Sequence, residues 1–439
     1  MTGETPKSYD VAVIGGGPAG ATVAALLTGR GRSVVLFEKT PHPRFHIGES
    51  LLPRNIPILE RMGVLEQVRA IGMYKPGAEF ISEDHPERQN FLFTEALDPN
   101  PSYAYQVRRS QFDEILLRNA AAKGAEVLEN CTVSDIAFGA GEHRIAYERG
   151  GAQQACRARF VIDASGRDGF LAGRLKLRSR NKAHNSAAMF GHFKDVPARA
   201  WTTPGNIGIY LFDHGWMWMI PLADGTTSVG AVCMPDHLKS RRGTLDEFFF
   251  ETLKMCTKLW SDLQSATLVS PVRGAGNYSY TAGRAFGDGY LLLGDAYVFV
   301  DPVFSSGVYI AMSSAELAAV AVDEALKRPE RAERLFRAYQ REVDRGIRRF
   351  SWLIYRFNAP AMRKLIMGSR NIFGLRSAVI SLVTGDVYSK NGGGWRHALF
   401  RGLYHALTVW DYGRNHGWAN RRRGFLSISV AEDEVAGRS

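Results

Sequence analysis

Long apolar runs are missing from this 439-residue sequence. The longest candidate, Val308 to Leu326, is broken by polar residues. These are Ser313, Ser314, Glu316, Asp323 and Glu324. A bilayer-spanning helix needs about 20 mostly apolar residues, so we predict no transmembrane segment. The polar N-terminus, MTGETPKSYD, also lacks the apolar stretch of a signal peptide. We therefore expect a cytoplasmic protein.

Cysteine is scarce, and its spacing excludes two kinds of stabilising site. The four cysteines show neither CxxC nor Cys/His spacing, so we predict neither a zinc site nor a disulfide framework. We expect reduced thiols buried in the core and no bound metal. The four residues are Cys131, Cys156, Cys233 and Cys256.

An acidic excess is also absent, because the formal net charge is +11. Such a surface favours acidic partners, which leaves nucleic acid, an acidic carrier protein or an anionic substrate open. No nucleic-acid-binding motif accompanies the charge, so we do not expect a nucleic-acid partner. We favour a basic surface that serves only solubility over any single partner as the explanation of the charge. The length predicts two or three core-forming units.

The N-terminal segment has the pattern of a dinucleotide-binding turn. The apolar run Asp10 to Ile14, typical of a buried parallel strand, leads into the sequence GGGPAG. Its three spaced glycines allow a tight turn, backbone approach to a pyrophosphate, and close packing of helix on strand. An alanine-rich helix then presents its N-terminal amides to the phosphates. The candidate binding residues are Gly15, Gly17, Pro18, Ala19 and Gly20.

A second strand, Ser33 to Phe37, ends at an acidic residue about twenty positions further on. Glu38 can accept hydrogen bonds from a ribose hydroxyl pair, and Lys39 follows it as another candidate cofactor-binding residue. This segment alone does not distinguish FAD from NAD.

Late in the chain, a strand from Tyr290 to Leu293 is followed by Gly294-Asp295-Ala296. A GDA at this place resembles the second flavin motif of para-hydroxybenzoate hydroxylase-like flavoproteins. The resemblance implies that Asp295 binds the ribityl and phosphate region of FAD and that Arg109 lies near the cofactor. It also implies that Asp163 to Arg167 occupies the place of the strand that returns to the nucleotide-binding domain. We therefore expect FAD.

The segment Gly215 to Pro221, GWMWMIP, contains WxWxIP and resembles flavin-dependent halogenases. On a strand, Trp216 and Trp218 face the same side, and Thr227 to Val232 is expected to return as the paired strand. In that family the tryptophans and the following Pro221 mark a tunnel beside the flavin. The alternative is a pair of tryptophans that fill the core beneath the sheet. We assign them no chemical step.

Lys75, in KPGAEF, resembles the catalytic lysine of the phenol and pyrrole halogenases. The resemblance implies that reduced FAD, oxygen and halide generate hypohalous acid, which this lysine then positions. An ammonium can polarise the oxidant through a hydrogen bond, whereas a neutral amine could form a haloamine. The alternative is a solvated loop lysine.

Asp301 to Val308, DPVFSSGV, resembles a flavin-proximal segment of the same branch. Free amides at the start of the following helix favour an anion, so we predict that halide binds at Ser306 and Gly307. Gly307 and Val308 are also candidate flavin contacts. Tryptophan halogenases carry glutamate at the position of Phe304, which argues against free tryptophan as substrate.

The segment FHIGESLLP resembles the part of this family that lines the flavin pocket and tunnel. Within it, Gly48 and Ser50 are the residues that we expect nearest the cofactor. The resemblance as a whole covers about Tyr9 to Leu326.

Beyond about Pro329 the sequence is helical and basic. One apolar stripe recurs at helical spacing, and we expect it to pack on the catalytic module. The alternative is contact with a membrane surface or a partner. Its residues are Trp395, Leu399, Leu403, Ala406, Leu407 and Trp410. The short TGDVYS, Thr384 to Ser389, resembles halogenases of carrier-tethered pyrrole, and Arg421 to Arg423 is expected to be exposed.

We predict an α/β protein with a para-hydroxybenzoate hydroxylase-like FAD-binding fold, an interleaved β-sheet substrate domain and a helical C-terminal part. The expected nucleotide-binding segments are about 8–75, 105–170 and 285–330. Substrate-domain segments are about 76–104 and 171–284, and the helical region is 331–439.

The implied activity is chlorination or bromination of a phenol or pyrrole, free or on a carrier protein, in secondary-metabolite biosynthesis. A separate reductase would supply the reduced FAD. The alternatives are a flavin-dependent hydroxylase and an inactive flavin-binding docking protein.

Overall fold

The computed structural model describes residues 6–299, 303–368, 371–388 and 394–414. Asp301, Ser389, residues 391–393 and Arg421 to Arg423 lie outside them. The chain forms two compact units, each built from three segments of sequence. The first unit comprises Met1–Tyr74, Ala104–Arg180 and Tyr280–Phe350. The second comprises Lys75–Tyr103, Asn181–Ser279 and Ser351–Ser439. Both contain helices and strands, which confirms the predicted α/β class.

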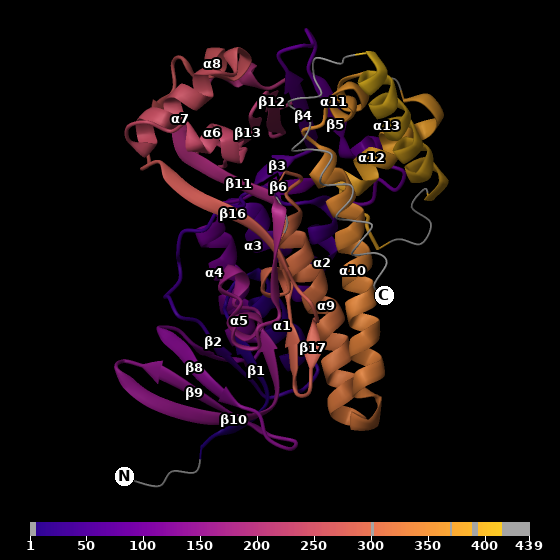
Figure 1. Cartoon of the computed structure of the whole chain (residues 1–439). Helices are drawn as coiled ribbons and strands as arrows, with labels where there is room; N and C mark the ends of the chain where they lie inside the picture. Colours follow the sequence, from indigo (N-terminus) through magenta and orange to yellow (C-terminus); the bar gives the residue numbers. More distant parts are fainter. Residues whose placement is uncertain (1–5, 300–302, 369–370, 389–393, 415–439) are drawn as a thin grey trace. The chain divides into compact units, whose positions relative to one another are not determined.

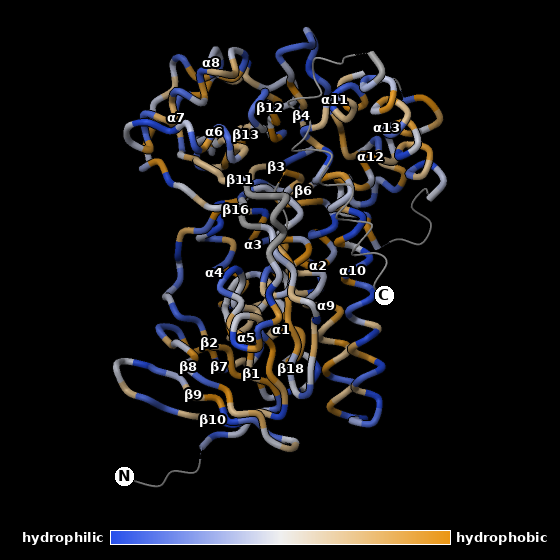
Figure 2. Tube along the Cα trace, in the orientation of Figure 1, coloured by the Kyte–Doolittle hydropathy of each residue, from blue (hydrophilic) through white to orange (hydrophobic). Residues whose placement is uncertain are grey.

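The first unit is built on a sheet with the order β17-β18-β10-β1-β2-β7, extended from β10 by β9 and β8 (Figure 1). Strands β18, β10, β1, β2 and β7 run parallel. The central strands are mostly apolar, as the orange of β1 in Figure 2 shows, and residues 11–13 of β1 and 34–37 of β2 are buried. The strands are β1 (Ser8–Ile14), β2 (Val34–Phe37), β7 (Glu126–Leu128), β8 (Cys131–Ala137), β9 (His143–Arg149), β10 (Ala152–Asp163), β17 (Phe286–Gly287) and β18 (Tyr290–Leu292).

Helix α1 lies at the centre of the helical layer of the first unit and packs against α4 and α9. Small residues fill α1, which allows this close packing. The helices are α1 (Pro18–Thr28), α2 (Ile56–Met62), α3 (Leu65–Ile71), α4 (Arg109–Ala122), α5 (Phe170–Arg174) and α9 (Ser306–Lys327). Helix α10 (Ala332–Arg356) begins in this unit.

The second unit contains a sheet with the order β11-β14-β13-β12-β4-β5. Only the β12–β4 pair in this run is parallel. The predicted WxWxIP strand and its return strand form an antiparallel hairpin, β13 and β14, which confirms that part of the sequence analysis. The strands are β4 (Gly77–Ser82), β5 (Gln89–Leu92), β11 (Arg178–Lys194), β12 (Ile207–Phe212), β13 (Gly215–Pro221) and β14 (Thr227–Cys233). Three short helices, α6 (Pro235–Lys239), α7 (Leu245–Lys254) and α8 (Thr257–Leu263), follow β14.

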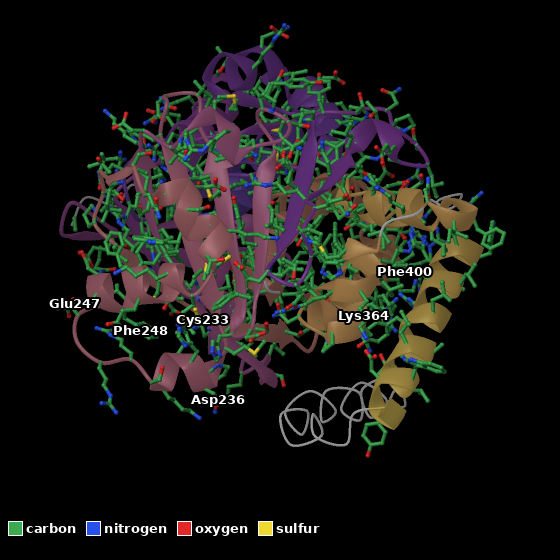
Figure 3. All side chains as sticks on the ribbon, turned by 90° about the horizontal axis from the view of Figure 1, so that it is seen from above. Cys233, Asp236, Glu247, Phe248, Lys364 and Phe400 are labelled. Atoms are coloured by element: carbon green, nitrogen blue, oxygen red, sulfur yellow. The ribbon has the colours of Figure 1, made fainter. Side chains whose placement is uncertain are left out.

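Helices α11 (Pro360–Met367), α12 (Leu375–Val383) and α13 (Gly394–Arg414) also belong to the second unit. Helix α13 packs on α11 and α12, and Lys364 of α11 and Phe400 of α13 are labelled in Figure 3. The apolar stripe that we expected α13 to bury is instead its exposed side, so that expectation is wrong. Phe400 and Tyr404 are buried, whereas Trp395 and Trp410 are 57% and 61% exposed. Helix α13 therefore carries two apolar stripes. The stripe that contains Phe400 and Tyr404 is buried, and the stripe that contains Trp395 and Trp410 is exposed.

All four cysteines are free and buried, as expected. Among the helices of the described residues, none combines the length and apolar character that a bilayer span requires.

Candidate functional site

The glycine turn after β1 cannot accept side chains at two of its positions. Gly15 has φ +100°, and a Cβ there would lie 2.4 Å from the Ala164 carbonyl oxygen. At Gly20 a Cβ would lie 1.9 Å from the Gly15 oxygen. The Gly15 N–H donates to the Phe37 carbonyl over 2.7 Å, which fixes the turn between β1 and β2. The two glycines therefore allow α1 to approach its strand closely.

Gly17 differs from these two because a Cβ there would make only one contact, at an ordinary van der Waals distance. The nearest atom to a Cβ there is Nη2 of Arg44, at 3.6 Å. Gly17 is the N-cap of α1, with no side-chain capping bond, and Pro18 and Ala19 open the helix. The guanidinium of Arg44 thus lies close to the first-turn amides, and together they favour an anion. The arrangement fits a pyrophosphate group.

We expect opposite outcomes from two alanine substitutions in this turn. Gly20→Ala should lower the free energy of unfolding by roughly 3 kcal/mol or more, because its Cβ overlaps backbone. Gly17→Ala should preserve folding, since its φ of −72° suits alanine. It should instead weaken FAD binding by about tenfold or more, because the added Cβ would stand where the pyrophosphate approaches the backbone. Thermal unfolding and flavin fluorescence titration measure the two effects. Equal stability losses would contradict the assignment.

Glu38 lies at the end of β2 with its carboxylate held by backbone. One oxygen accepts from the Gly16 N–H at 2.7 Å, and the other accepts from the N–H and hydroxyl of Thr40. Arg44 lies 3.7 Å from the same carboxylate. The oriented acid is suited to a ribose hydroxyl pair. Lys39 instead forms an exposed ion pair with Asp168.

Arg109 fixes the loop that carries Gly48 and Ser50. Its guanidinium makes two bonds to Asp113, at 2.7 and 2.9 Å, and donates to the Ile47 carbonyl at 2.8 Å. Gly48 has φ +105°, and a Cβ there would lie 3.1 Å from Nη1 of Arg109. Ser50 is buried and forms an isolated antiparallel bridge with Gln106. Arg109 is predicted to lie near the cofactor, and its hydrogen bonds make it a positioning residue for this loop.

Asp295 follows β18 in the short helical turn η5 (Gly294–Ala296), which packs against α9. A Cβ at Gly294 would lie 3.6 Å from the Ala19 side chain, so η5 also lies beside the start of α1. Desolvation raises the pKa of Asp295 to about 6, while the charges of Arg167 and Arg109 oppose that rise. The carboxylate is therefore poised to gain hydrogen bonds from a polyhydroxyl ligand.

The start of α9 offers an uncapped helix end. Its N-cap, Ser305, has φ +57° and makes no side-chain capping bond. The buried hydroxyl of Ser306 has no hydrogen-bond partner in the described part of the chain. A Cβ at Gly307 would meet nothing within 4 Å, whereas Phe304 and Val308 on either side are buried. Open space at Gly307 and an unsatisfied hydroxyl beside it fit a ligand at this helix end.

Ser305 holds a left-handed conformation that costs a non-glycine residue about 1 kcal/mol. We therefore expect Ser305→Gly to raise the free energy of unfolding by about 1 kcal/mol. The matched change Ser306→Gly, inside the helix, should lower it by a similar amount. Thermal unfolding of the two variants measures the difference. If Ser305→Gly were no more stable than Ser306→Gly, the strain at Ser305 would not be real.

In the second unit, Lys75 is an unusually buried lysine at the end of β3 (Met73–Lys75). It is 2% exposed, and its Nζ lies 5.3 Å from the centroid of the Phe93 ring. Desolvation lowers the pKa of Lys75 to about 7. A lysine that titrates near neutrality is typical of functional sites, so the solvated-loop alternative is wrong.

The tryptophan pair lies on β13, as alternation predicts. The ring centroids of Trp216 and Trp218 are 5.7 Å apart, and both side chains are buried. Trp218 donates to the Ser228 hydroxyl over 3.2 Å, and a Cβ at Gly230 would lie 2.3 Å from its ring. Gly230 thus makes room for this indole. Trp216 also packs edge-on against Phe357, and Pro221 ends the strand.

The predicted residues therefore fall into two sets. The first unit holds the glycine turn, Glu38, the Gly48 loop, Asp295 and the start of α9, while the second holds Lys75 and the WxWxIP strand. Sequence reasoning missed Arg44 and Phe93. The signal for Arg44 was a basic residue directly before FHIGES, whereas Phe93 becomes recognisable only through its contact with Lys75.

Comparison with known proteins assigns the chain to a family. The model of the Tryptophan halogenase family matches residues 96–362, and that of an NAD(P)-binding Rossmann-like domain matches residues 13–54. These matches agree with the Rossmann-like arrangement of the first unit.

Two curated relatives carry halogenase names. The chain is 33% identical over 408 residues to the 1H-pyrrole-2-carbonyl-(peptidyl-carrier protein) chlorinase of Pseudomonas fluorescens, covering 87% of this chain and 90% of the relative. It is 38% identical over 328 residues to the tryptophan 2-halogenase of Chondromyces crocatus, covering 73% and 62%.

A solved structure of a flavin-dependent brominase matches with a TM-score of 0.82 and 28% identity, over 93% of this chain and all of that chain. The likeness confirms the predicted fold class and favours halogenation over the hydroxylase alternative. The chain therefore belongs to the flavin-dependent halogenases, oxidoreductases that bind FAD and consume halide.

Proposed function

We propose that this halogenase acts on an electron-rich pyrrole-type ring that is held as a thioester on an acidic carrier protein. Similarity to the pyrrolyl-carrier chlorinase along 90% of that enzyme supports the substrate class. The net charge of +11 suits an acidic carrier. Phe304, where tryptophan halogenases carry glutamate, favours a substrate other than free tryptophan. A phenol is the competing substrate.

The residues of the first unit fit FAD. The amides of Gly17 to Gly20 would hold the pyrophosphate, Glu38 a ribose, and Asp295 the ribityl hydroxyls. Gly48 and Ser50 would line the pocket, with their loop fixed by Arg109. A separate flavin reductase would deliver the reduced FAD. When bound, this cofactor would react with oxygen and halide and so supply the electrophilic halogen.

Chloride or bromide would bind the amides of Ser306 and Gly307. The uncapped end of α9, the unsatisfied Ser306 hydroxyl and the open space at Gly307 support this placement. Val308 would contact the flavin ring from the same turn.

The chemical step depends on Lys75. The burial of this lysine is the observation that supports its role in halogen transfer. With a pKa of about 7, its ammonium and amine forms are both populated at neutral pH. The ammonium donates a hydrogen bond to the oxygen of hypohalous acid, which makes the halogen more electrophilic. The neutral amine could instead carry the halogen as a haloamine. Trp216, Trp218 and Pro221 would line the tunnel and take no part in the chemistry.

A substrate comparison tests the proposed function. Purified protein, a flavin reductase, FAD, oxygen and bromide would be supplied with pyrrole-2-carbonyl thioester on a peptidyl carrier protein, free pyrrole-2-carboxylate, a phenol or tryptophan. Mass spectrometry should show the bromine isotope pattern on the carrier-bound ring, with a kcat/KM at least about tenfold above any free substrate. Bromination of the phenol alone would overturn the assigned substrate class.

A further inference from the structure

Helix α13 has one face that packs on its own unit and one that does not. Tyr404 packs edge-on against Trp352 at 5.5 Å between centroids, and Phe400 does so at 6.2 Å. Lys364 of α11 binds Asp411 over 2.6 Å. Positions 400, 404 and 411 lie on one side of a helix, so this side fixes α13 in place.

The opposite side carries large apolar side chains in the open. Trp395, Leu399, Leu403, Val409 and Trp410 are exposed by 57%, 38%, 37%, 72% and 61%. Small residues between them, Ala398, Gly402 and Ala406, are also exposed and leave a continuous apolar strip. A strip of this kind is a mark of an interaction surface.

Helix α13 is itself basic. It holds three arginines, one aspartate and no glutamate, and that aspartate, Asp411, already pairs with Lys364. The guanidinium of Arg396 lies 4.6 Å from the Trp395 ring centroid, and that of exposed Arg401 lies 4.9 Å from Trp352. Tryptophan and arginine are the residues most enriched at the energetic centres of protein interfaces. The face therefore complements an acidic protein that offers apolar side chains.

Helix α13 is linked to the segment that contacts Lys75. It packs on α12, and α12 packs on η2 (Phe93–Glu95). Ser381 of α12 accepts a hydrogen bond from the Leu97 N–H at 2.8 Å, and Arg376 pairs with Glu95 at 3.3 Å. The ring that faces the Lys75 ammonium is Phe93, in the same turn.

We infer that the exposed face of α13 is the docking surface for the acidic carrier protein that brings the aromatic ring. This inference rests on the proposed function, and it adds where the partner binds. A lipid surface is the alternative, which binding to anionic vesicles distinguishes from a carrier protein. Docking there places the carrier on the helices that support the Lys75 segment.

The test compares Leu399→Ser/Leu403→Ser with a matched double change of exposed apolar residues in the first unit, Leu175→Ser/Val320→Ser. Each full-length protein is assayed with two substrates that bear the same acyl group. One is pyrrole-2-carbonyl thioester on a peptidyl carrier protein, and the other is the pantetheine thioester. The α13 variant should raise KM for the carrier-bound substrate by about tenfold and leave kcat unchanged. Its kcat/KM for the pantetheine thioester should equal that of the wild type.

Anisotropy of the labelled carrier protein should show the same loss of affinity, and the control variant should bind like the wild type. An unchanged KM for the carrier-bound substrate in the α13 variant would overturn the docking surface while leaving the proposed function intact. Wild-type halogenation of free phenols but not of any carrier-bound ring would overturn both. A loss of binding to anionic phospholipid vesicles without a change in carrier KM would assign the face to a membrane and overturn the inference.

Discussion

Lys75→Ala is expected to lower the rate of ring halogenation by roughly 10²–10⁴-fold. The substitution removes the group that we propose to hold and polarise the electrophilic halogen. It alters none of the predicted FAD-binding residues, all of which belong to the first unit. Product formation by mass spectrometry measures the loss, and flavin fluorescence should give an unchanged affinity for FAD.

The matched control for this substitution is Lys254→Ala, an exposed lysine in the same unit that lies over the Trp260 ring. Its rate should equal that of the wild type within a factor of about two. A Lys75→Ala enzyme that halogenates at the wild-type rate would remove Lys75 from the mechanism. A loss of FAD binding together with activity would show instead that the substitution disturbs the fold.

Lys75→Met is expected to stabilise the protein at neutral pH and to change how stability depends on pH. The folded-state pKa of about 7 lies below the ordinary 10.5. Between these values the unfolded chain holds a proton that the folded protein has released, so wild-type stability rises with pH. Burial of the charged Lys75 lowers the free energy of unfolding of the wild type. This loss is fully present below about pH 7 and disappears above about pH 10.5. Its full size is on the order of 4–5 kcal/mol, at 1.36 kcal/mol for each pKa unit.

Urea unfolding of the wild type and of Lys75→Met at several pH values between 7 and 10 measures this dependence. Because every other titrating group is common to both proteins, their difference in stability reports Lys75 alone. The gap should narrow by about 1.4 kcal/mol for each pH unit. Parallel curves over this range would show that Lys75 keeps an ordinary pKa.

The nucleotide-binding part could be predicted from sequence because its constraints are local. A Cβ at Gly15 or Gly20 collides with backbone of the same turn, and Glu38 is held by Gly16 and Thr40. Alternation along one strand similarly predicted that Trp216 and Trp218 share a side. Each of these inferences depends on neighbours within one or two elements.

The features that the sequence could not predict depend on distant segments. KPGAEF contains nothing that buries a lysine, and the ring beside Lys75 comes from Phe93. Helix α13 carries two apolar stripes, and the contact of Tyr404 with Trp352 decides which of them is covered. The sequence predicts an anion site at the start of α9, and this stays a prediction, whereas the left-handed Ser305 before it could not be predicted.

The most direct test of the account asks whether Lys75 keeps the electrophilic halogen inside the protein. Wild type and Lys75→Met would be run with reductase, FAD, oxygen and bromide, with and without a thioether that traps free hypobromous acid. Brominated ring and oxidised thioether would be counted in the same samples. We predict that ring bromination by the wild type survives the trap, and that Lys75→Met oxidises the thioether in equal total amount without brominating the ring. Two results together would contradict the account. The trap would abolish ring bromination by the wild type, and without the trap Lys75→Met would brominate the ring as fast as the wild type.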